Sequence, residues 1–443
     1  MTISDVKVKT HDVVIVGGGF TGLAAAYALA KSGKIVKVLE SDSAPGGLAG
    51  TFEFSDQVKV EKFYHHWFNN DLFVPELVRQ LGLEGNITLH TTKTGMYFNG
   101  RIWKLSSPLD VLRFKALPLI DRIRLGLLVI QVRRVKNWKT IEHLSVREWL
   151  EPLCGSKVYK LVWEPLLNAK FSVYSEEISA VWMWKKLVLR GSTRNRKGGE
   201  QLAYFKGGFG RLSKALVTAI EELGGSVELN SPVISATVVG NRIEMLETDK
   251  GSFTAHQFIF TPAFPIIADI LKDVADPTWL LKLRRVKYLG NICLVLRLDR
   301  SLSSTYWLNV NDPGFPFVGV IEHTNFDSTE NYAGHHVVYL SRYVSPEDDV
   351  WQLDSEEYFN EAITHLKNMF PALELNWIVD YAICRAEFAQ PITEKGYSEY
   401  VPSVTTPFSN AWISTMAQIY PEDRGTNYAI REGFSIAQRI IKL

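Results

Sequence analysis

The chain has 443 residues, enough for two or three domains and a large core. Its 49 Lys and Arg nearly balance 48 Asp and Glu, and a net charge of +1 gives no support for general nucleic-acid binding. Cys154, Cys293 and Cys384 form no metal-ligand spacing, so we expect free thiols in a reducing compartment and no metal site. The N-terminus has no apolar signal core and no run of about 18 apolar residues occurs, which predicts a cytoplasmic protein without a transmembrane helix.

Residues 12–40 have the pattern of strand, glycine-rich turn, helix and strand. The β-branched run 13–16 predicts a buried parallel strand, and the Ala-rich run 23–31 predicts a helix. The glycines between them form G-x-G-x-x-G, in which the first allows a tight turn, the second admits a pyrophosphate and the third lets the helix pack on the strand. The helix N-terminus would then face the phosphates. We therefore expect cofactor contacts from Gly17, Gly19, Phe20, Thr21 and Gly22.

Glu40 ends the second strand of this unit. A carboxylate there can accept hydrogen bonds from a ribose diol, and it disfavours the 2′-phosphate of NADP. The alternative is a βαβ unit that uses its glycines only for packing. That alternative explains Gly22 but neither the complete triplet nor Glu40.

The segment after Glu40 resembles the flavoprotein family of amine oxidases, protoporphyrinogen oxidases and phytoene desaturases, to which UDP-galactopyranose mutases are distant relatives. Gly46, Gly47 and Thr51 match the family's Gly-Gly pair and the Thr or Ser that follows it. The arginines that often flank the pair are replaced by Ala44 and Leu48. The resemblance implies FAD as the cofactor, with contacts from Gly46, Gly47, Leu48 and Ala49.

His65 and His66 stand among four aromatic residues in the segment 61–68. In similar flavoproteins this segment runs beside the flavin ring, which makes both histidines catalytic candidates. The alternative is that their rings pack in an aromatic cluster with satisfied nitrogens.

Residues 107–139 combine many apolar residues with eight Lys or Arg and only two Asp. A basic amphipathic stretch can lie on an anionic membrane surface, so we expect a peripheral membrane contact here. The alternative is a pair of core-packed helices with a solvated basic face.

Two later blocks continue the resemblance. Gly207, Gly208, Leu212 and Val233 match a helix and strand that return the chain to the FAD domain, which implies that Val233 contacts adenine and that Thr261 closes the site. The last block, 411–441, ends in a helix whose N-terminus faces the flavin pyrimidine ring in similar proteins and would stabilise negative charge there. It lacks the usual Gly-acid pair, which Asp423 would replace. The contacts implied in this block come from Asp423, Asn427, Tyr428 and Ala429.

Glu322 and His323 form a polar cluster at the end of a predicted strand in the region 263–385. Catalytic groups collect at such positions, and both side chains can act as acid or base. The alternative is a hydrogen-bonded turn.

The predicted fold is α/β, with a doubly wound, Rossmann-like FAD domain of the glutathione-reductase type and an inserted mixed α+β substrate domain. We assign 1–95, 200–262 and 386–443 to the FAD domain, 96–199 to a helical cap and 263–385 to a β-rich substrate domain.

The predicted function is FAD-dependent dehydrogenation of an apolar or aromatic small molecule, with hydride transfer to flavin N5 and electrons passing to oxygen or a quinone. Many similar amine oxidases carry a lysine on the strand facing N5, and 288–298 contains none, which argues against amine oxidation. One alternative is a non-redox sugar-nucleotide mutase, whose cationic diphosphate site the sequence does not show clearly. Another is a binding protein with a vestigial flavin site.

Overall fold

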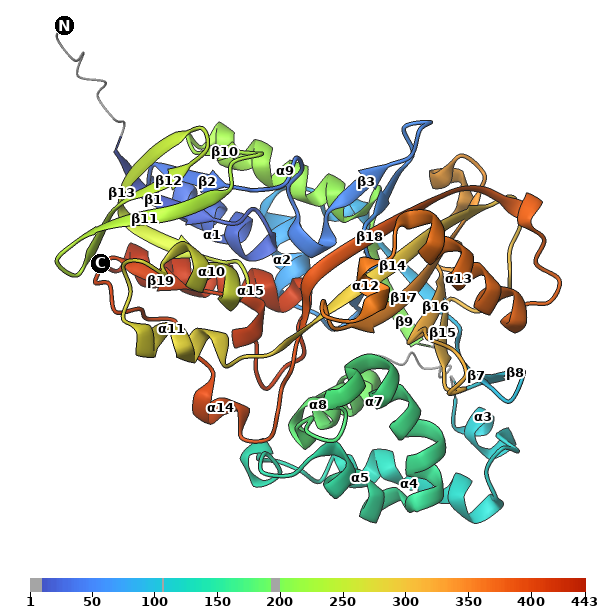
Figure 1. Ribbon diagram of the computed structural model, residues 1–443. Helices are drawn as coiled ribbons and strands as arrows, with labels where there is room; N and C mark the ends of the chain where they lie inside the picture. Colours follow the sequence, from blue (N-terminus) through green and yellow to red (C-terminus); the bar gives the residue numbers. More distant parts are fainter. Residues whose placement is uncertain (1–9, 106, 193–199) are drawn as a thin grey trace, which may run out of the picture.

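The structure is a computed structural model that describes residues 10–105, 107–192 and 200–443. Two seven-stranded sheets organise these residues, and a group of helices lies apart from the first sheet at the lower edge of Figure 1. Within the described residues, no helix combines the length and the apolar character needed to cross a membrane.

The first sheet confirms the predicted doubly wound architecture. Five of its strands are parallel and lie in the spatial order β10, β2, β1, β13, β19. The second half of β13 pairs with β1 and β19, whereas its first half pairs with the antiparallel strand β12. Strand β12 in turn pairs with β11, also antiparallel. The strands are β1 (His11–Val16), β2 (Val36–Leu39), β10 (Ser226–Glu228), β11 (Val233–Val239), β12 (Arg242–Thr248), β13 (Gly251–Phe260) and β19 (Ala411–Ile413).

Both faces of this sheet are covered, which explains the continuous apolar run of β1. Val13 and Ile15 join one buried cluster with the helices of the first face, and Val14 and Val16 join another cluster on the opposite face. A strand buried on both sides needs apolar residues at every position rather than at alternate ones. The first face is covered by α1 (Phe20–Lys31), α9 (Gly208–Glu222) and α15 (Thr426–Ile441), and the second by α10 (Phe264–Ile270) and α11 (Pro277–Arg284).

Helix α15 crosses α1 at very close range. A Cβ atom on Gly433 would overlap the carbonyl oxygen of Thr21 and press on Ala24. Glycine at this position therefore brings the C-terminal helix against the first helix of the chain. Helix α2 (Phe73–Gln80) packs beside α15.

The second sheet has the order β18–β14–β17–β16–β15–β7–β8 and is antiparallel except between β15 and β7. Its last hairpin turns at Asn99 and Gly100, both with positive φ, as the Asn-Gly pair predicts. Helix α13 (Ser355–Met369) packs against the sheet through a shared apolar core. The strands are β7 (Thr94–Phe98), β8 (Arg101–Lys104), β14 (Tyr288–Leu298), β15 (Trp307–Val310), β16 (Gly319–Glu322), β17 (His336–Val344) and β18 (Ile378–Pro391).

The region 107–192 is helical, and its apolar core also includes Leu289 and Tyr343 of the second sheet. A capping box begins α5, because the Ser145 hydroxyl accepts a hydrogen bond from the Glu148 N–H and the Glu148 carboxylate accepts one from the Ser145 N–H. The stretch 107–139 is not one continuous helix, since a turn before Pro118 separates α3 from α4 and α4 ends at Val132. The helices are α3 (Pro108–Arg113), α4 (Leu119–Val132), α5 (Val146–Cys154), α6 (Ser156–Val158), α7 (Glu164–Phe171) and α8 (Ala180–Ser192).

Two small sheets join these parts. One pairs β3 (Thr51–Glu53) with β4 (Lys59–Glu61), and the other has the order β5 (Trp67–Phe68), β9 (Glu200–Phe205), β6 (Ile87–Thr92). The domain boundaries assigned from the sequence stay a prediction.

Candidate cofactor and active site

The glycine-rich turn after β1 has the geometry that the motif predicts. Gly17 has φ +100°, and a Cβ atom on Gly22 would overlap the Gly17 carbonyl oxygen. Helix α1 begins after Gly19, which provides no side-chain cap, so the first N–H groups of the helix, at Phe20 and Thr21, have no acceptor within the helix. These groups are the ones available to a phosphate.

A second glycine loop lies against the first. The Gly46 N–H donates to the Gly18 carbonyl over 2.9 Å, and Gly46 and Gly47 both have positive φ. A Cβ atom on Gly47 would lie 3.2 Å from the Gly19 Cα, so side chains at this pair of loops would push them apart. Leu48 and Ala49 follow in a short 3-10 turn. The two loops therefore form one cradle of bare backbone.

Glu40 is 6% exposed and closes one side of this cradle. One carboxylate oxygen accepts a hydrogen bond from the Gly18 N–H at 2.5 Å, and the other accepts one from the Asp42 N–H at 2.8 Å. A carboxylate has about four acceptor positions, so Glu40 retains capacity for a ribose hydroxyl. The segment leading to Val233 is held beside it, because the Ser231 N–H donates to the Glu40 carbonyl. Thr261 fixes the other side by donating its hydroxyl to the Val16 carbonyl over 2.8 Å.

The N-terminus of α15 forms the far end of the candidate site. Gly425 precedes it without a side-chain cap, which leaves N–H groups and a partial positive charge available. The Asn427 carboxamide is engaged elsewhere: its oxygen accepts hydrogen bonds from the N–H groups of Phe73 and Val74 at the start of α2. Tyr428 and Ala429, also expected at the cofactor, follow in the first turn of α15.

Asp423 connects this end of the site to the helical region. It accepts a hydrogen bond from Trp182 Nε1 at 2.9 Å and forms an ion pair with Lys186 at 2.6 Å. Burial by itself raises the pKa of Asp423, but the charges of Lys186, Lys170 and Arg424 outweigh it and hold that pKa well below the usual range. Asp423 therefore stays ionised and anchors α8 beside the N-terminus of α15.

His65 and His66 lie between the two sheets in different hydrogen-bonding environments. His65 Nδ1 is 2.7 Å from the Phe63 carbonyl; because a carbonyl only accepts, Nδ1 carries the proton and Nε2 keeps a lone pair. Burial lowers the pKa of His65, so its ring is neutral at pH 7. His66 Nδ1 lies 2.9 Å from the Tyr306 hydroxyl inside a cluster of aromatic rings. A catalytic role for either histidine stays a prediction.

We expect His65→Ala to change turnover or the flavin spectrum while leaving the fold intact, because the neutral Nε2 lone pair is lost. We compare this variant with His66→Ala, because the imidazole of His66 is held by Tyr306 and neighbouring aromatic rings instead. Steady-state kinetics and visible absorption of both variants test this. Wild-type turnover and an unaltered spectrum in both would remove the histidines from the mechanism.

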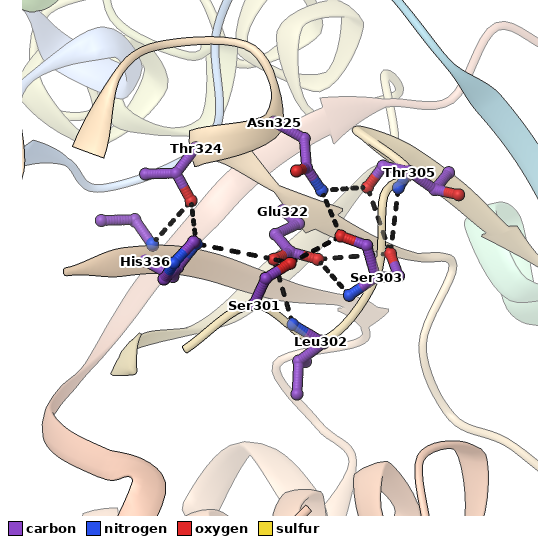
Figure 2. Close-up of polar contacts among 9 residues, drawn as sticks. Ser301, Leu302, Ser303, Thr305, Glu322, Thr324, Asn325 and His336 are labelled. Carbon is purple, nitrogen blue, oxygen red and sulfur yellow. Dashed lines mark hydrogen bonds and ion pairs between the residues drawn. The ribbon is translucent and has the colours of Figure 1, made fainter. Parts of the chain in front are cut away.

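Glu322 ends β16 in a dense polar cluster, and His323 follows it in the chain. Figure 2 shows the Glu322 carboxylate held by the 301–303 loop, with hydrogen bonds from the hydroxyls of Ser301 and Ser303 and from the N–H groups of Leu302 and Ser303. Glu322 is 2% exposed, and burial raises its pKa. These contacts match the hydrogen-bonded turn that was the alternative interpretation.

His323 is fully buried among aromatic rings. Tyr332 donates its hydroxyl proton to Asp327, so the 2.7 Å contact between His323 Nε2 and the Tyr332 oxygen is a donation from the imidazole. Burial lowers the pKa of His323, which favours the neutral ring.

A cavity of about 850 Å³ lies between the helical region and the second sheet. Its walls come from the 116–118 turn, from α7 and from the strands β15 and β17. The lining mixes apolar side chains such as Leu117, Leu161 and Phe315 with Lys157 and Lys160. This volume suits a drug-sized organic molecule.

Tyr343 connects this cavity to the end of the cofactor site. Its ring lines the cavity, and its hydroxyl accepts a hydrogen bond from Arg424 Nη2 at 2.9 Å. Arg424 also donates to the Gln390 side chain at 2.9 Å, and Lys170 Nζ lies 4.6 Å from the centre of the Tyr343 ring. The sequence analysis missed Tyr343, Gln390 and Arg424. No local pattern marks them, since they come from three distant segments.

The bare glycine cradle, the buried carboxylate and the free helix N-terminus together define a dinucleotide-binding protein of the two-sheet flavoprotein class. The chain belongs to the family described as flavin containing amine oxidoreductase, which matches residues 20–441. Its cofactor is accordingly FAD, and the residues present fit it. Gly17 and Gly46 adopt the positive φ of the two turns, and Gly47 lets the two loops close on each other. Gly19 presents bare backbone to the pyrophosphate, and Glu40 has acceptor capacity for the ribose.

Relatives and solved structures agree with this family. The flavin-containing amine oxidase B of Sus scrofa is 26% identical over 269 residues, which cover 58% of this chain and 51% of the relative. The chain thus spans about half the length of that curated relative. The structure named "Putative protoporphyrinogen oxidase" from Exiguobacterium sp. 255-15 has a TM-score of 0.75 at 17% identity and covers 98% of this chain and 99% of its own. Reduced UDP-galactopyranose mutase has a TM-score of 0.72 at 14% identity, with 98% and 96% covered. These two structures support the fold.

Proposed function

We propose that this protein is an FAD-dependent oxidoreductase that dehydrogenates a small molecule with an apolar or aromatic body. One observation carries the proposal: a cavity of about 850 Å³ reaches Tyr343, whose hydroxyl contacts Arg424 beside the N-terminus of α15. A substrate in this cavity lies next to the end of the site expected to hold the flavin ring.

The residues of the chain bind, orient and exclude water in this proposal. Bound FAD supplies the chemistry by accepting a hydride at N5 and passing electrons to oxygen or a quinone. Arg424 holds Tyr343 and Gln390 in place, and the α15 N-terminus stabilises negative charge near its N–H groups.

The residues of strand β14 indicate which type of bond the enzyme oxidises. It contains no lysine, and its central residue Cys293 is fully buried, which raises the pKa of the thiol well above its usual range. We therefore favour oxidation of a saturated C–C bond over oxidation of an amine, the reaction named for several relatives.

A sugar-nucleotide mutase is the second candidate, and the cavity supplies one observation in its favour. Lys157, Lys160 and Arg342 contribute cationic groups to the lining, as a diphosphate requires, although Glu164, Asp312 and Asp348 balance them. Arg342 is in addition paired with Glu361 over 2.8 Å.

The first experiment is the visible spectrum of the purified protein, followed by heating and identification of the released compound. We expect a yellow protein that releases FAD. A colourless protein that also fails to take up added FAD would support the vestigial-site hypothesis instead.

The second experiment distinguishes an oxidoreductase from a mutase by testing whether candidate substrates reduce the flavin under anaerobic conditions. An oxidoreductase bleaches the flavin and consumes acceptor in proportion to product. A mutase turns over many substrate molecules after a single addition of reductant and consumes no acceptor.

A further inference from the structure

The outward face of α3 and α4 carries an apolar surface that nothing in the described chain covers. Each of its eight Leu, Ile and Val side chains is between 42% and 62% exposed. We call this surface the outer patch. Its members are Leu109, Leu112, Leu119, Ile120, Ile123, Leu127, Val129 and Ile130.

Helix α4 is apolar on two opposite sides. Leu128 and Val132 are buried against the helical core, whereas Ile120, Ile123, Leu127 and Ile130 follow a helical spacing of three and four residues on the exposed side. A helix that covers a core normally shows a polar outer face to water. The apolar outer face of α4 therefore indicates that a second apolar surface, outside the described chain, covers it.

The charge around the outer patch is strongly positive. Residues 107–139 hold eight Lys or Arg against two Asp, a net +6, while the whole chain carries +1, so the remainder carries −5. Asp121 is buried and its carboxylate pairs with Arg124 over 3.0 Å, which removes one acid from the surface. The exposed basic residues of this segment are Arg113, Lys115, Arg124, Arg133, Arg134, Lys136 and Lys139.

The corner between α3 and α4 is fixed rather than loose. Arg122 donates to the carbonyls of Leu117 and Leu112 at 2.7 and 2.9 Å, and Phe114 and Leu117 are buried beneath it. The two helices are therefore held in a fixed arrangement, and both lie in the lower part of Figure 1, away from the first sheet.

We propose that the outer patch docks on an anionic lipid surface, with its Leu and Ile side chains in the interface and its Lys and Arg side chains at the headgroups. This combination of an apolar face with basic flanks is what an interfacial helix uses. A second copy of the chain fits less well, because two such patches would bring a net +6 against a net +6.

Docking in this way has a consequence for the substrate, which rests on the proposed function. The turn between α3 and α4 supplies Ala116, Leu117 and Pro118 to the wall of the 850 Å³ cavity. The cavity would then lie beside the lipid, and its substrate would be a lipid-soluble molecule.

Sedimentation with vesicles tests the docking without any turnover. We expect the full chain to bind vesicles of phosphatidylglycerol and phosphatidylcholine and not vesicles of phosphatidylcholine alone. Raising the salt from 0.05 to 0.5 M should weaken binding about tenfold, because headgroup attraction is screened. The double variant Ile123→Asp/Leu127→Asp should weaken it by about tenfold or more, since two exposed apolar side chains that would enter the lipid interface are lost.

Leu281→Asp on α11 is the matched control for the apolar change, because Leu281 is 65% exposed but lies on the first sheet's helical cover. Arg134→Glu reverses one charge beside the outer patch and should also weaken binding to the anionic vesicles; Lys214→Glu on α9, at another exposed basic residue, is its control. Both controls should bind as the unaltered chain does, and each variant should keep its flavin spectrum. No binding to the anionic vesicles, equal binding by the double variant, or a dimer in light scattering that Ile123→Asp dissociates would overturn the proposal.

Discussion

Gly22→Ala is expected to yield a protein that binds little or no FAD. The added Cβ would overlap the carbonyl oxygen of Gly17, so α1 must move away from the strand that it covers. That movement displaces the N–H groups at the start of α1 from the phosphates and opens the contact of α1 with α15 at Gly433. We expect FAD content to fall by about tenfold or more, since helix position and phosphate contacts fail together. Flavin absorbance per protein, before and after dialysis against FAD, measures it.

Gly126→Ala is the matched control for this substitution. Gly126 lies in α4, where a Cβ would have no neighbour within 4 Å. Alanine there should raise the free energy of unfolding by about 0.5–1 kcal/mol through helix propensity and leave FAD content unchanged. Full FAD content in Gly22→Ala would show that the turn tolerates a side chain, and it would contradict the packing argument.

Glu322→Leu is expected to destabilise the protein by about 3–5 kcal/mol. The carboxylate accepts hydrogen bonds from Ser301, Leu302 and Ser303, and leucine would leave these donors without a buried partner. Urea unfolding followed by tryptophan fluorescence measures the loss. If Glu322 only supports the turn, turnover per bound FAD stays unchanged; a loss of turnover by about a hundredfold or more at intact FAD content would establish the acid–base role instead.

Glu322→Gln separates charge from hydrogen bonding at the same position. The amide oxygen can still accept from the 301–303 loop, so its stability loss should be smaller than that of leucine. Burial raises the folded-state pKa of Glu322 above its unfolded value of about 4.5, so ionisation favours the unfolded chain. The stabilisation that protonated Glu322 contributes to the free energy of unfolding is therefore present below pH 4.5 and is lost as the pH rises through the raised pKa. Glu322→Gln cannot ionise, so its free energy of unfolding, measured between pH 4 and 7, should not show this loss.

The cofactor half of the candidate site was predictable because the residues that form it lie close together in the sequence. The turn at Gly17, Gly19 and Gly22 depends on backbone freedom within one βαβ unit, and Glu40 follows the second strand directly. The relative positions of these residues are set within the βαβ unit and do not depend on the other parts of the chain that pack against it. The structure accordingly places Glu40 against Gly18, and it places the Gly46–Gly47 loop beside Gly19.

The substrate half was not predictable in the same way. Glu322 resembled an acid or base in sequence, but its partners at 301–303 are reached only when a loop folds back on β16. At the cofactor end, the side chain of Asn427 likewise has a distant partner, because it caps α2, some 350 residues earlier in the chain; its contact with the flavin stays a prediction. The sequence shows that a buried polar side chain needs a hydrogen-bond partner, but it does not show which residue the fold brings to it.

The βαβ cofactor unit, the resemblance to flavoproteins and the basic, apolar character of 107–139 can all be read from the amino-acid order. The contacts of Arg424 with Tyr343 and Gln390, and the side of α4 that faces water, become visible only in the folded chain. The physical reason is the range of the interactions. Turn geometry and helix periodicity are set by neighbours along the chain, whereas burial and side-chain pairing depend on which distant surfaces the two sheets and the helical region bring together.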